Sequence, residues 1–154
     1  MAAAGVKMIV VRLPQVHDTV KQGLITPLIA LAREKGVSAY LGEGRTRWSA
    51  AHISDVARLY RLALEKQDAG ARYNAVAEEG ITAREIAEVI GEGLGVPAVS
   101  LSEGEVAGHF GWLAAFAGLD FSASSARTRA ELGWQPTGPG LIADLKGMRY
   151  HGGL

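Results

Sequence analysis

The sequence contains no cysteine among its 154 residues. This absence excludes a disulfide framework, cysteine-ligated zinc, iron–sulfur clusters and a thiol nucleophile, and it is typical of proteins from reducing compartments. No apolar run reaches the roughly 18 to 20 residues that span a bilayer, and no signal-peptide pattern is visible. The sequence therefore predicts a cytoplasmic protein without a membrane segment.

An excess of charge of either sign is also missing, because 16 basic residues balance 16 acidic ones. Such a balance gives no general field for nucleic acid or anionic lipid, so neither is expected as a partner. Hydrophobic residues make up 48% of the chain and charged residues 21%, which is typical of globular proteins. At this length, residues 1–154 are expected to form a single domain.

Short apolar segments alternate with helical patterns along the chain. Strands are predicted at residues 7–12, 37–41, 51–53, 72–76 and 96–101. Helices are predicted at residues 18–35, 55–66, 83–94, 103–117 and 125–132. This alternation predicts an α/β layer with mostly parallel strands, and the tail after Pro136 is expected to be irregular.

Local signals mark the ends of several predicted helices. Thr82 and Glu85 have the spacing of a capping box, and the same spacing recurs from Ser102. Gly36 stands where a helix closes through a left-handed residue. Pro27 lies inside the first predicted helix and predicts a kink or a break there.

The sequence lacks the motifs of common α/β enzymes. Gly91, Gly93 and Gly95 close a helix, so they cannot present helix N-terminal amides to a pyrophosphate. There is no P-loop, no nucleophile elbow and no His-Glu-x-x-His, and none of the four tyrosines has a lysine four residues later. No two of the four histidines share a helical face, so no metal site is predicted. These motifs therefore assign no catalytic residue.

Five residues remain as candidates, and each has a structural alternative. His17 follows a predicted strand, where open α/β sheets bind ligands, but it could equally be an ordinary loop histidine. His52 is either catalytic or a half-buried structural histidine, and Trp48 is either a pocket wall or a core anchor. Arg45 and Arg47 could hold an anionic group, although exposed arginines in a loop are usually only solvated.

Several segments, in order and at suitable separations, resemble one family. They comprise residues 11–17, 40–57, 73–76, 82–86 and 131–136. Residues 40–57 include a Gly-Glu-Gly turn, a histidine and Asp-Val-Ala, and residues 131–136 read Glu-Leu-Gly-Trp-Gln-Pro. Together they resemble the C-terminal, substrate-binding half of extended or atypical short-chain dehydrogenase/reductases of the NAD-dependent epimerase/dehydratase type.

The resemblance implies a truncated Rossmann-like fold: the remaining parallel strands with their helices, plus a small C-terminal substrate-binding α/β region. The full-length family uses NAD or NADP. Its Gly-rich loop and Tyr-x-x-x-Lys pair both lie upstream of the segment equivalent to Arg12, and this sequence has neither. The resemblance therefore implies that the chain alone binds the cofactor weakly or not at all and is not a competent oxidoreductase.

Six residues take a role by resemblance. The cofactor-facing positions are Leu13 and Pro14, and the substrate-binding positions are Gln15, His17, Trp48 and His52. Sugar-nucleotide epimerases commonly carry an arginine where Trp48 stands, in contact with a diphosphate. Because an indole cannot replace that charge-assisted bond, the resemblance points to a more apolar carbonyl or alcohol substrate.

The resemblance also predicts a partner. Without an upstream half, the strand at 7–12 would leave one edge and one face of the sheet open. We therefore expect self-association or docking onto a separate N-terminal half. Two alternatives stay open: a non-catalytic small-molecule-binding or protein-interaction module derived from this fold, and an unrelated small α/β protein.

Overall fold

Strands and helices alternate along residues 5–151, the part of the chain that the computed structural model describes. The strands are β1 (Val10–Arg12), β2 (Gln15–His17), β3 (Ser38–Leu41), β4 (Arg47–His52), β5 (Arg72–Asn74), β6 (Glu78–Thr82) and β7 (Ala98–Leu101). The helices are α1 (Ile25–Lys35), α2 (Ile53–Lys66), α3 (Ala83–Leu94), α4 (Glu103–Phe110), the 3₁₀ turn η1 (Gly111–Leu113), α5 (Ala114–Ala117), α6 (Ala126–Leu132) and α7 (Leu141–Gly147).

The strands pair in three small sheets. β1 pairs with β5, β2 with β4 and β3 with β7, all in parallel, whereas β6 is antiparallel to β4. Parallel neighbours need long crossover connections, and helices such as α1 and α2 provide them. The predicted α/β architecture with mostly parallel strands is therefore confirmed.

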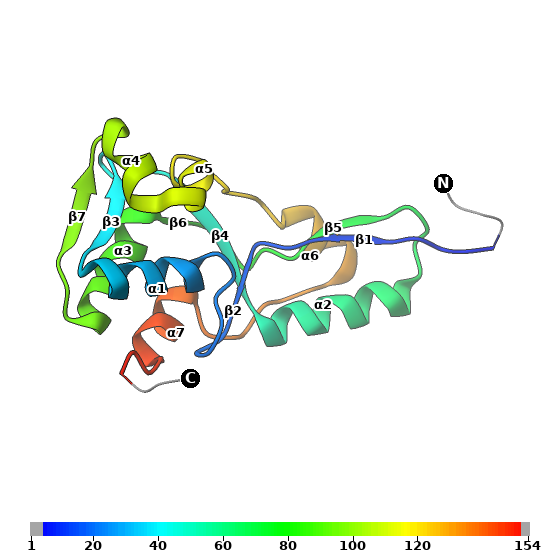
Figure 1. Cartoon of the computed structure of the whole chain (residues 1–154). Coiled ribbons are helices and arrows are strands. Elements are labelled where there is room, and N and C mark those ends of the chain that lie inside the picture. The colour runs from blue at the N-terminus through cyan, green and yellow to red at the C-terminus, as the bar shows by residue number, and fades with distance from the viewer. Residues whose placement is uncertain (1–4, 152–154) are drawn as a thin grey trace.

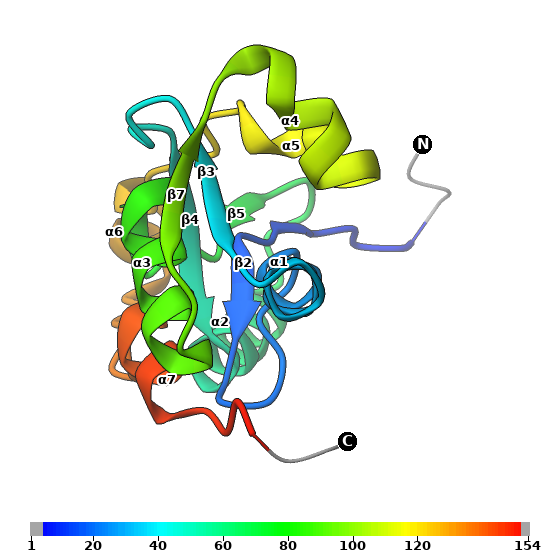
Figure 2. The ribbon, with the colours of Figure 1, turned by 60° about the vertical axis from the view of Figure 1, so that its left-hand side comes forward.

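These elements form a wide lobe and a narrow extension (Figure 1). In the lobe, β3, β4 and β7 lie between α3 and α7 on one side and α1, α4 and α5 on the other (Figure 2). The extension holds β1, β5, α2 and α6. Each part has its own apolar core, centred in the lobe on Ile25, Ile90 and Leu145 and in the extension on Leu59 and Tyr73.

The helix after β6 begins and ends as the sequence predicts. The Thr82 hydroxyl accepts a hydrogen bond from the Glu85 amide, and the Glu85 carboxylate accepts from the Thr82 amide. The Thr82 hydroxyl and amide hold the pKa of Glu85 below its ordinary value. Gly95 closes the helix at φ 71°, a conformation that glycine adopts without strain.

The first predicted helix is too long at its N-terminus. α1 begins at Ile25, because the Asp18 carboxylate accepts hydrogen bonds from the amides of Val20 and Lys21 and bends this segment into a turn. Pro27 is then the third helical residue. The predicted break is absent, since α1 continues from Ile25 to Lys35. Proline is tolerated there because amides of the first turn have no partner within the helix.

Three further expectations need correction. The apolar helix predicted at 103–117 breaks at Gly111, whose φ of 55° and ψ of −124° are not helical. The tail after Pro136 is not irregular, since α7 packs its buried Leu141 and Leu145 into the lobe. The sequence also missed β2 and β6, which are short and partly polar.

The helices of the structure can be compared with the expectation that the chain has no membrane-spanning segment. Among residues 5–151, no helix combines the length and the apolar character that crossing a membrane requires.

Candidate functional site

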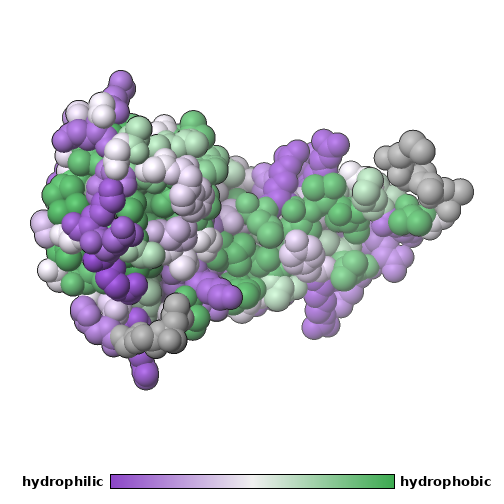
Figure 3. Space-filling view, in the orientation of Figure 1, coloured by the Kyte–Doolittle hydropathy of each residue, from purple (hydrophilic) through white to green (hydrophobic). Residues whose placement is uncertain are grey.

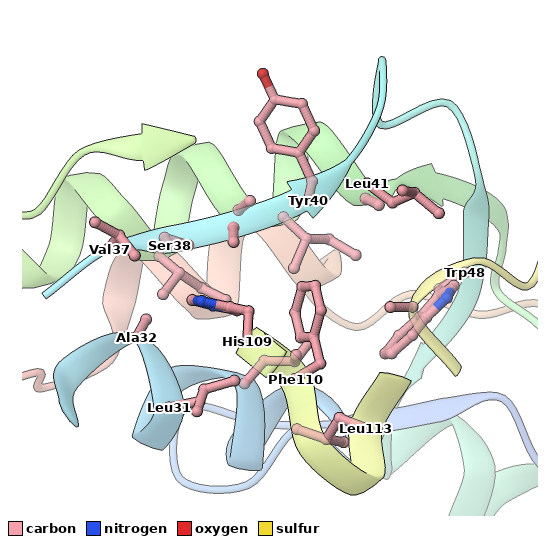
Figure 4. Close-up of a pocket in the computed structure, with 17 residues that line it drawn as sticks. Leu31, Ala32, Val37, Ser38, Tyr40, Leu41, Trp48, His109, Phe110 and Leu113 are labelled. Atoms are coloured by element: carbon pink, nitrogen blue, oxygen red, sulfur yellow. The ribbon is translucent and has the colours of Figure 1, made fainter. Parts of the chain in front are cut away.

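An apolar pocket lies in the lobe between β3, α1, α3 and the α4–η1 segment (Figure 4). Its walls are Leu28, Leu31, Ala32, Val37, Ser38, Ala39, Tyr40, Leu41, Trp48, Ala83, Ile86, Ala87, Ile90, His109, Phe110, Leu113 and Ala117. It encloses about 40 Å³ of free volume, or about 590 Å³ of empty space when the open mouth is included. The enclosed part has room for only a few atoms.

The walls of this pocket carry few polar groups. Ser38, Tyr40 and His109 are the polar side chains besides the indole of Trp48, and the Tyr40 hydroxyl points away from the pocket in Figure 4. Burial, aided by the positive charge of Lys35, lowers the pKa of His109 and favours its neutral form. The lining of the pocket is therefore mainly apolar.

Trp48 is both a pocket wall and a core anchor, so the two interpretations of this residue coincide. It is only 4% exposed and belongs to the main core of the lobe. Its ring meets Phe121 edge-on at a centroid distance of 6.0 Å. The indole Nε1 is buried and has no hydrogen-bond partner among the described residues. Of the six residues assigned by resemblance, Trp48 is the one that lines this pocket.

His17 and His52 come together outside the pocket. Parallel pairing of β2 with β4 places them opposite each other, with ring centroids 5.7 Å apart. His17 is buried within β2, not in a loop, and its Nδ1 lies 2.6 Å from the Oδ2 of Asp144 on α7. His52 Nε2 lies 3.8 Å from the same oxygen. The two histidines and Asp144 thus form a polar cluster that joins two strands to α7.

The remaining contacts of this cluster are structural. The His52 Nδ1 accepts a hydrogen bond from the Ser54 amide and so caps α2. His17 Nε2 is buried without a hydrogen bond, 4.0 Å from Glu78 Oε2, and Glu78 itself accepts from the Leu141 amide. Among residues 5–151, no group of three histidine or acidic side chains is arranged to hold a metal ion. The cluster fastens α7 to the sheet.

Leu13, Pro14 and Gln15 do not reach the pocket. Leu13 is 54% exposed and Pro14 is half-buried. The side-chain oxygen of Gln15 accepts a hydrogen bond from the Leu24 amide. A Cβ at Gly23 would lie 2.5 Å from that oxygen, so this bond depends on a glycine there. Gln15 therefore orders the loop before α1 in this chain.

The Asp-Val-Ala motif and the Leu-Gly-Trp-x-Pro motif meet in space. The buried carboxylate of Asp55 accepts hydrogen bonds from the amides of Thr137 and Gly138 and pairs with Arg58. The indole of Trp134 donates to the Asp55 carbonyl at 2.9 Å. No signal in the sequence joined these segments, which are about eighty residues apart, although the resemblance had marked both.

The two arginines next to Trp48 are engaged elsewhere. Arg47 pairs with Asp120 at 3.2 Å and donates to the Ser122 hydroxyl, which fastens the chain after α5. Arg45 pairs with Glu43 on the surface. Neither contributes a charge to the pocket wall.

Comparisons with known proteins place this geometry in context. No family model matches the chain. The chain is 45% identical over 150 residues to the uncharacterized protein C2A9.02 of Schizosaccharomyces pombe, and 43% identical over 143 residues to the uncharacterized protein YLL056C of Saccharomyces cerevisiae. These alignments cover 97% and 92% of the chain but 51% and 48% of the yeast proteins. The chain therefore spans about half the length of these relatives.

Solved structures share its fold. The human epimerase family protein SDR39U1 with NADPH superposes with a TM-score of 0.70 at 26% identity, over 98% of this chain and 51% of that one. The dTDP-glucose 4,6-dehydratase DesIV of Streptomyces venezuelae, with NAD bound, gives 0.68 at 18% identity, over 94% and 43%. The UDP-glucose 4-epimerase of Thermus thermophilus with NAD gives 0.63 at 18% identity, over 92% and 45%. The chain thus has the α/β, Rossmann-like fold of NAD-dependent epimerases and dehydratases, which supports the superfamily that its sequence resembles.

Proposed function

We propose that residues 1–154 form one domain, the C-terminal, substrate-binding portion of an NAD(P)-dependent oxidoreductase of the epimerase/dehydratase type. The chain has the fold of such proteins but neither a Gly-rich dinucleotide loop nor a Tyr-x-x-x-Lys pair. It therefore binds NAD or NADP weakly or not at all by itself and is inactive alone. The observation that carries this proposal is the open face of the extension.

That face begins at β1. β5 occupies one edge of this strand, and no described strand occupies the other, so backbone groups there remain available. Ile9 and Val11 point into the core of the extension, whereas Met8 and Val10 point outward and are 51% and 41% exposed. Hydrophobic surface gathers over this part of the molecule (Figure 3).

α2 also exposes apolar side chains. Its buried side uses Val56 and Leu59. Tyr60 and Leu64 on the same helix are exposed, Leu64 to 67%. Exposed apolar side chains on β1 and α2 together mark a surface that a further polypeptide covers.

The partner that fits this face supplies a strand to β1 and apolar side chains to α2. The yeast relatives are about twice as long as the chain, so about half of each relative has no counterpart here. We identify the partner with a polypeptide of that kind, a separate N-terminal half that brings the cofactor loop and the catalytic pair. In that complex, Leu13 and Pro14 would face the cofactor, and Gln15, His17, Trp48 and His52 would border the substrate. That substrate position would lie outside the apolar pocket, which Trp48 alone of these residues lines.

Co-expression with the unmatched half of the Schizosaccharomyces pombe relative tests the proposal. We expect a one-to-one complex that binds NADPH or NADH, measured by sedimentation and by nicotinamide fluorescence. A Val10→Lys chain should fail to assemble, because it places a charge on the docking face. A homodimer that excludes the second polypeptide, or a chain that stays monomeric in its presence, would contradict the assignment.

A non-catalytic small-molecule-binding or protein-interaction module remains the second candidate, because the apolar pocket could be retained without chemistry. Restored NAD(P)-dependent turnover in the complex favours the oxidoreductase. Complex formation without cofactor binding favours the module. A cytoplasmic location belongs to the same proposal and agrees with the complete lack of cysteine.

A further inference from the structure

We propose that the face of the β1–β5 pair that α2 leaves open receives an amphipathic helix of the partner, whose carboxylates pair with Arg12 and Arg72. The inference rests on the proposed function, because it states the chemistry by which the second polypeptide docks. It adds an ionic contact and a covering helix to the strand pairing described for that partner.

The two faces of the β1–β5 pair are covered unequally. α2 lies along one side of the pair, where Ile9 and Val11 pack into the core of the extension (Figure 1). Side chains alternate along a strand, so Met8, Val10 and Arg12 belong to the opposite face. Met8 is 51% exposed and Val10 is 41% exposed. Because parallel sheets are generally covered by helices on both faces, the element that fits this open face is a helix.

Two arginines add positive charge to the open face. Arg72 lies opposite Val10 in the register of the two strands, and Arg12 is two residues further along β1, so both belong to this face. Both residues are exposed, and neither pairs with a carboxylate among residues 5–151. Arg127 on α6 of the extension, by contrast, pairs with Glu131. The open face therefore presents two charges that no described carboxylate neutralises.

The spacing of these charges defines the helix that fits. Arg12 and Arg72 are offset by two residues along the strands and by one strand spacing, which separates their Cα atoms by roughly 8 Å. A helix rises roughly 5.4 Å per turn, so carboxylates one or two turns apart on one side of it can reach both guanidinium groups. Met8 and Val10 fit an apolar stripe beside those carboxylates. The face therefore favours an acidic amphipathic helix.

Removal of the two charges tests the ionic contact. The probe is the unmatched half of the Schizosaccharomyces pombe relative. Arg12→Gln combined with Arg72→Gln should weaken its binding about tenfold, as the loss of two exposed ion pairs predicts, and should remove most of the salt dependence of the affinity. Arg45→Gln combined with Arg84→Gln removes the same charge from the surface of the lobe and should change the affinity by less than about twofold.

Carbodiimide coupling locates the partner's carboxylates. Arg12→Lys and Arg72→Lys keep the charges and add primary amines, which carbodiimide joins to carboxylates in contact with them. Each variant should bind within about threefold of the wild type and give a new cross-link to an acidic residue of the second polypeptide, identified by mass spectrometry. We expect the two acidic residues on one helix, one or two turns apart. Val20→Lys, which adds an amine to the lobe, is the control and should give no such cross-link.

The outcomes separate this inference from the proposed function. A complex whose affinity and salt dependence survive the double substitution to glutamine, or cross-links to residues that do not share a helix, would overturn the helix inference and leave the proposed function standing. Failure of the wild-type chain to bind the second polypeptide, or cross-links only to a second copy of the chain, would overturn both.

Discussion

The lobe and the extension are built from the same kinds of element, yet they differ in how completely helices and neighbouring strands cover their strands. In the lobe, helices cover the strands on both sides, and residues such as Ile25 and Leu145 are completely buried (Figure 2). In the extension, α2 covers one face of the β1–β5 pair and α6 lies against β5, where Thr128 accepts a hydrogen bond from the Asn74 amide. The second edge of β1 carries no described strand.

The difference lies mainly at the edge of β1 with which no described strand pairs. The lobe buries the apolar residues of its core and caps α3 with Thr82 and Glu85, although Trp112 and Leu119 remain exposed. The extension leaves Met8, Val10 and Leu64 exposed, and no described strand pairs with the second edge of β1. The lobe accordingly supplies the pocket, and the extension supplies the surface on which we propose that a second polypeptide docks.

Asp55 on α2 of the extension binds the segment that leads to α7 of the lobe, a contact that we call the junction. Removing it should have the largest effect on the free energy of unfolding. Asp55→Ala removes the acceptor of the Thr137 and Gly138 amides and leaves Arg58 unpaired, which should lower the free energy of unfolding by about 3 kcal/mol or more. Urea unfolding measures this loss of free energy. Asp68→Ala is the control, because its ion pair with Lys66 is exposed and should contribute less than about 1 kcal/mol. Equal losses would refute the junction role.

Inside the lobe, Gly93 tests how tightly the C-terminal segment is held. A Cβ at this position would overlap the ring of Tyr150, so Gly93→Ala must displace that ring and should cost about 1–3 kcal/mol. Gly104→Ala, where nothing lies within 4 Å, should be neutral or stabilising by up to about 1 kcal/mol. Thermal unfolding distinguishes the two, and a neutral Gly93→Ala would mean that Tyr150 is not packed there.

Tyr150 itself should show an alkaline dependence. Burial raises the pKa of its phenol to about 12, so the folded state favours the neutral form. Its contribution to stability is complete below the ordinary pKa of about 10 and is lost as the pH rises from about 10 to 12. Tyr150→Phe should weaken this loss. It should also raise stability at pH 7 by about 1 kcal/mol, because the buried hydroxyl has no partner among residues 5–151.

On the extension, a surface substitution should leave stability almost unchanged. Val10→Lys should alter the free energy of unfolding by less than about 0.5 kcal/mol, because the side chain already faces solvent. It should nevertheless reduce self-association of the isolated chain in sedimentation. Val20→Lys, at an exposed valine on the lobe, is the matched control and should leave association as it is. A large stability loss at Val10 would show that β1 is already covered.

Sequence patterns predicted what local interactions determine. The capping box at Thr82 and the left-handed Gly36 involve residues within one helical turn, so their spacing is visible in the chain. The start of α1 was mistaken because the turn at Asp18 and the bond from the Leu24 amide to Gln15 compete with helix formation. Propensity alone does not resolve that competition.

The candidate site was only partly predictable, because its contacts join distant segments. Asp144 meets His17 across 127 residues, and it lies in a helix that the sequence did not reveal. α7 has seven residues and follows a Gly-Pro-Gly segment, so it shows too little periodicity to stand out, and its stability comes from burial of Leu141 and Leu145. Trp48 was identified as a candidate from the sequence. That its indole nitrogen is buried without a partner among the described residues depends on contacts from distant segments, which the sequence does not show.

Calorimetric titration of NAD⁺ and NADP⁺ into the isolated chain tests the central claim most directly. If the cofactor loop and catalytic pair belong to a second polypeptide that docks on the extension, neither nucleotide should bind at micromolar concentrations until that polypeptide is added. Micromolar binding of either one to the chain alone would contradict the account.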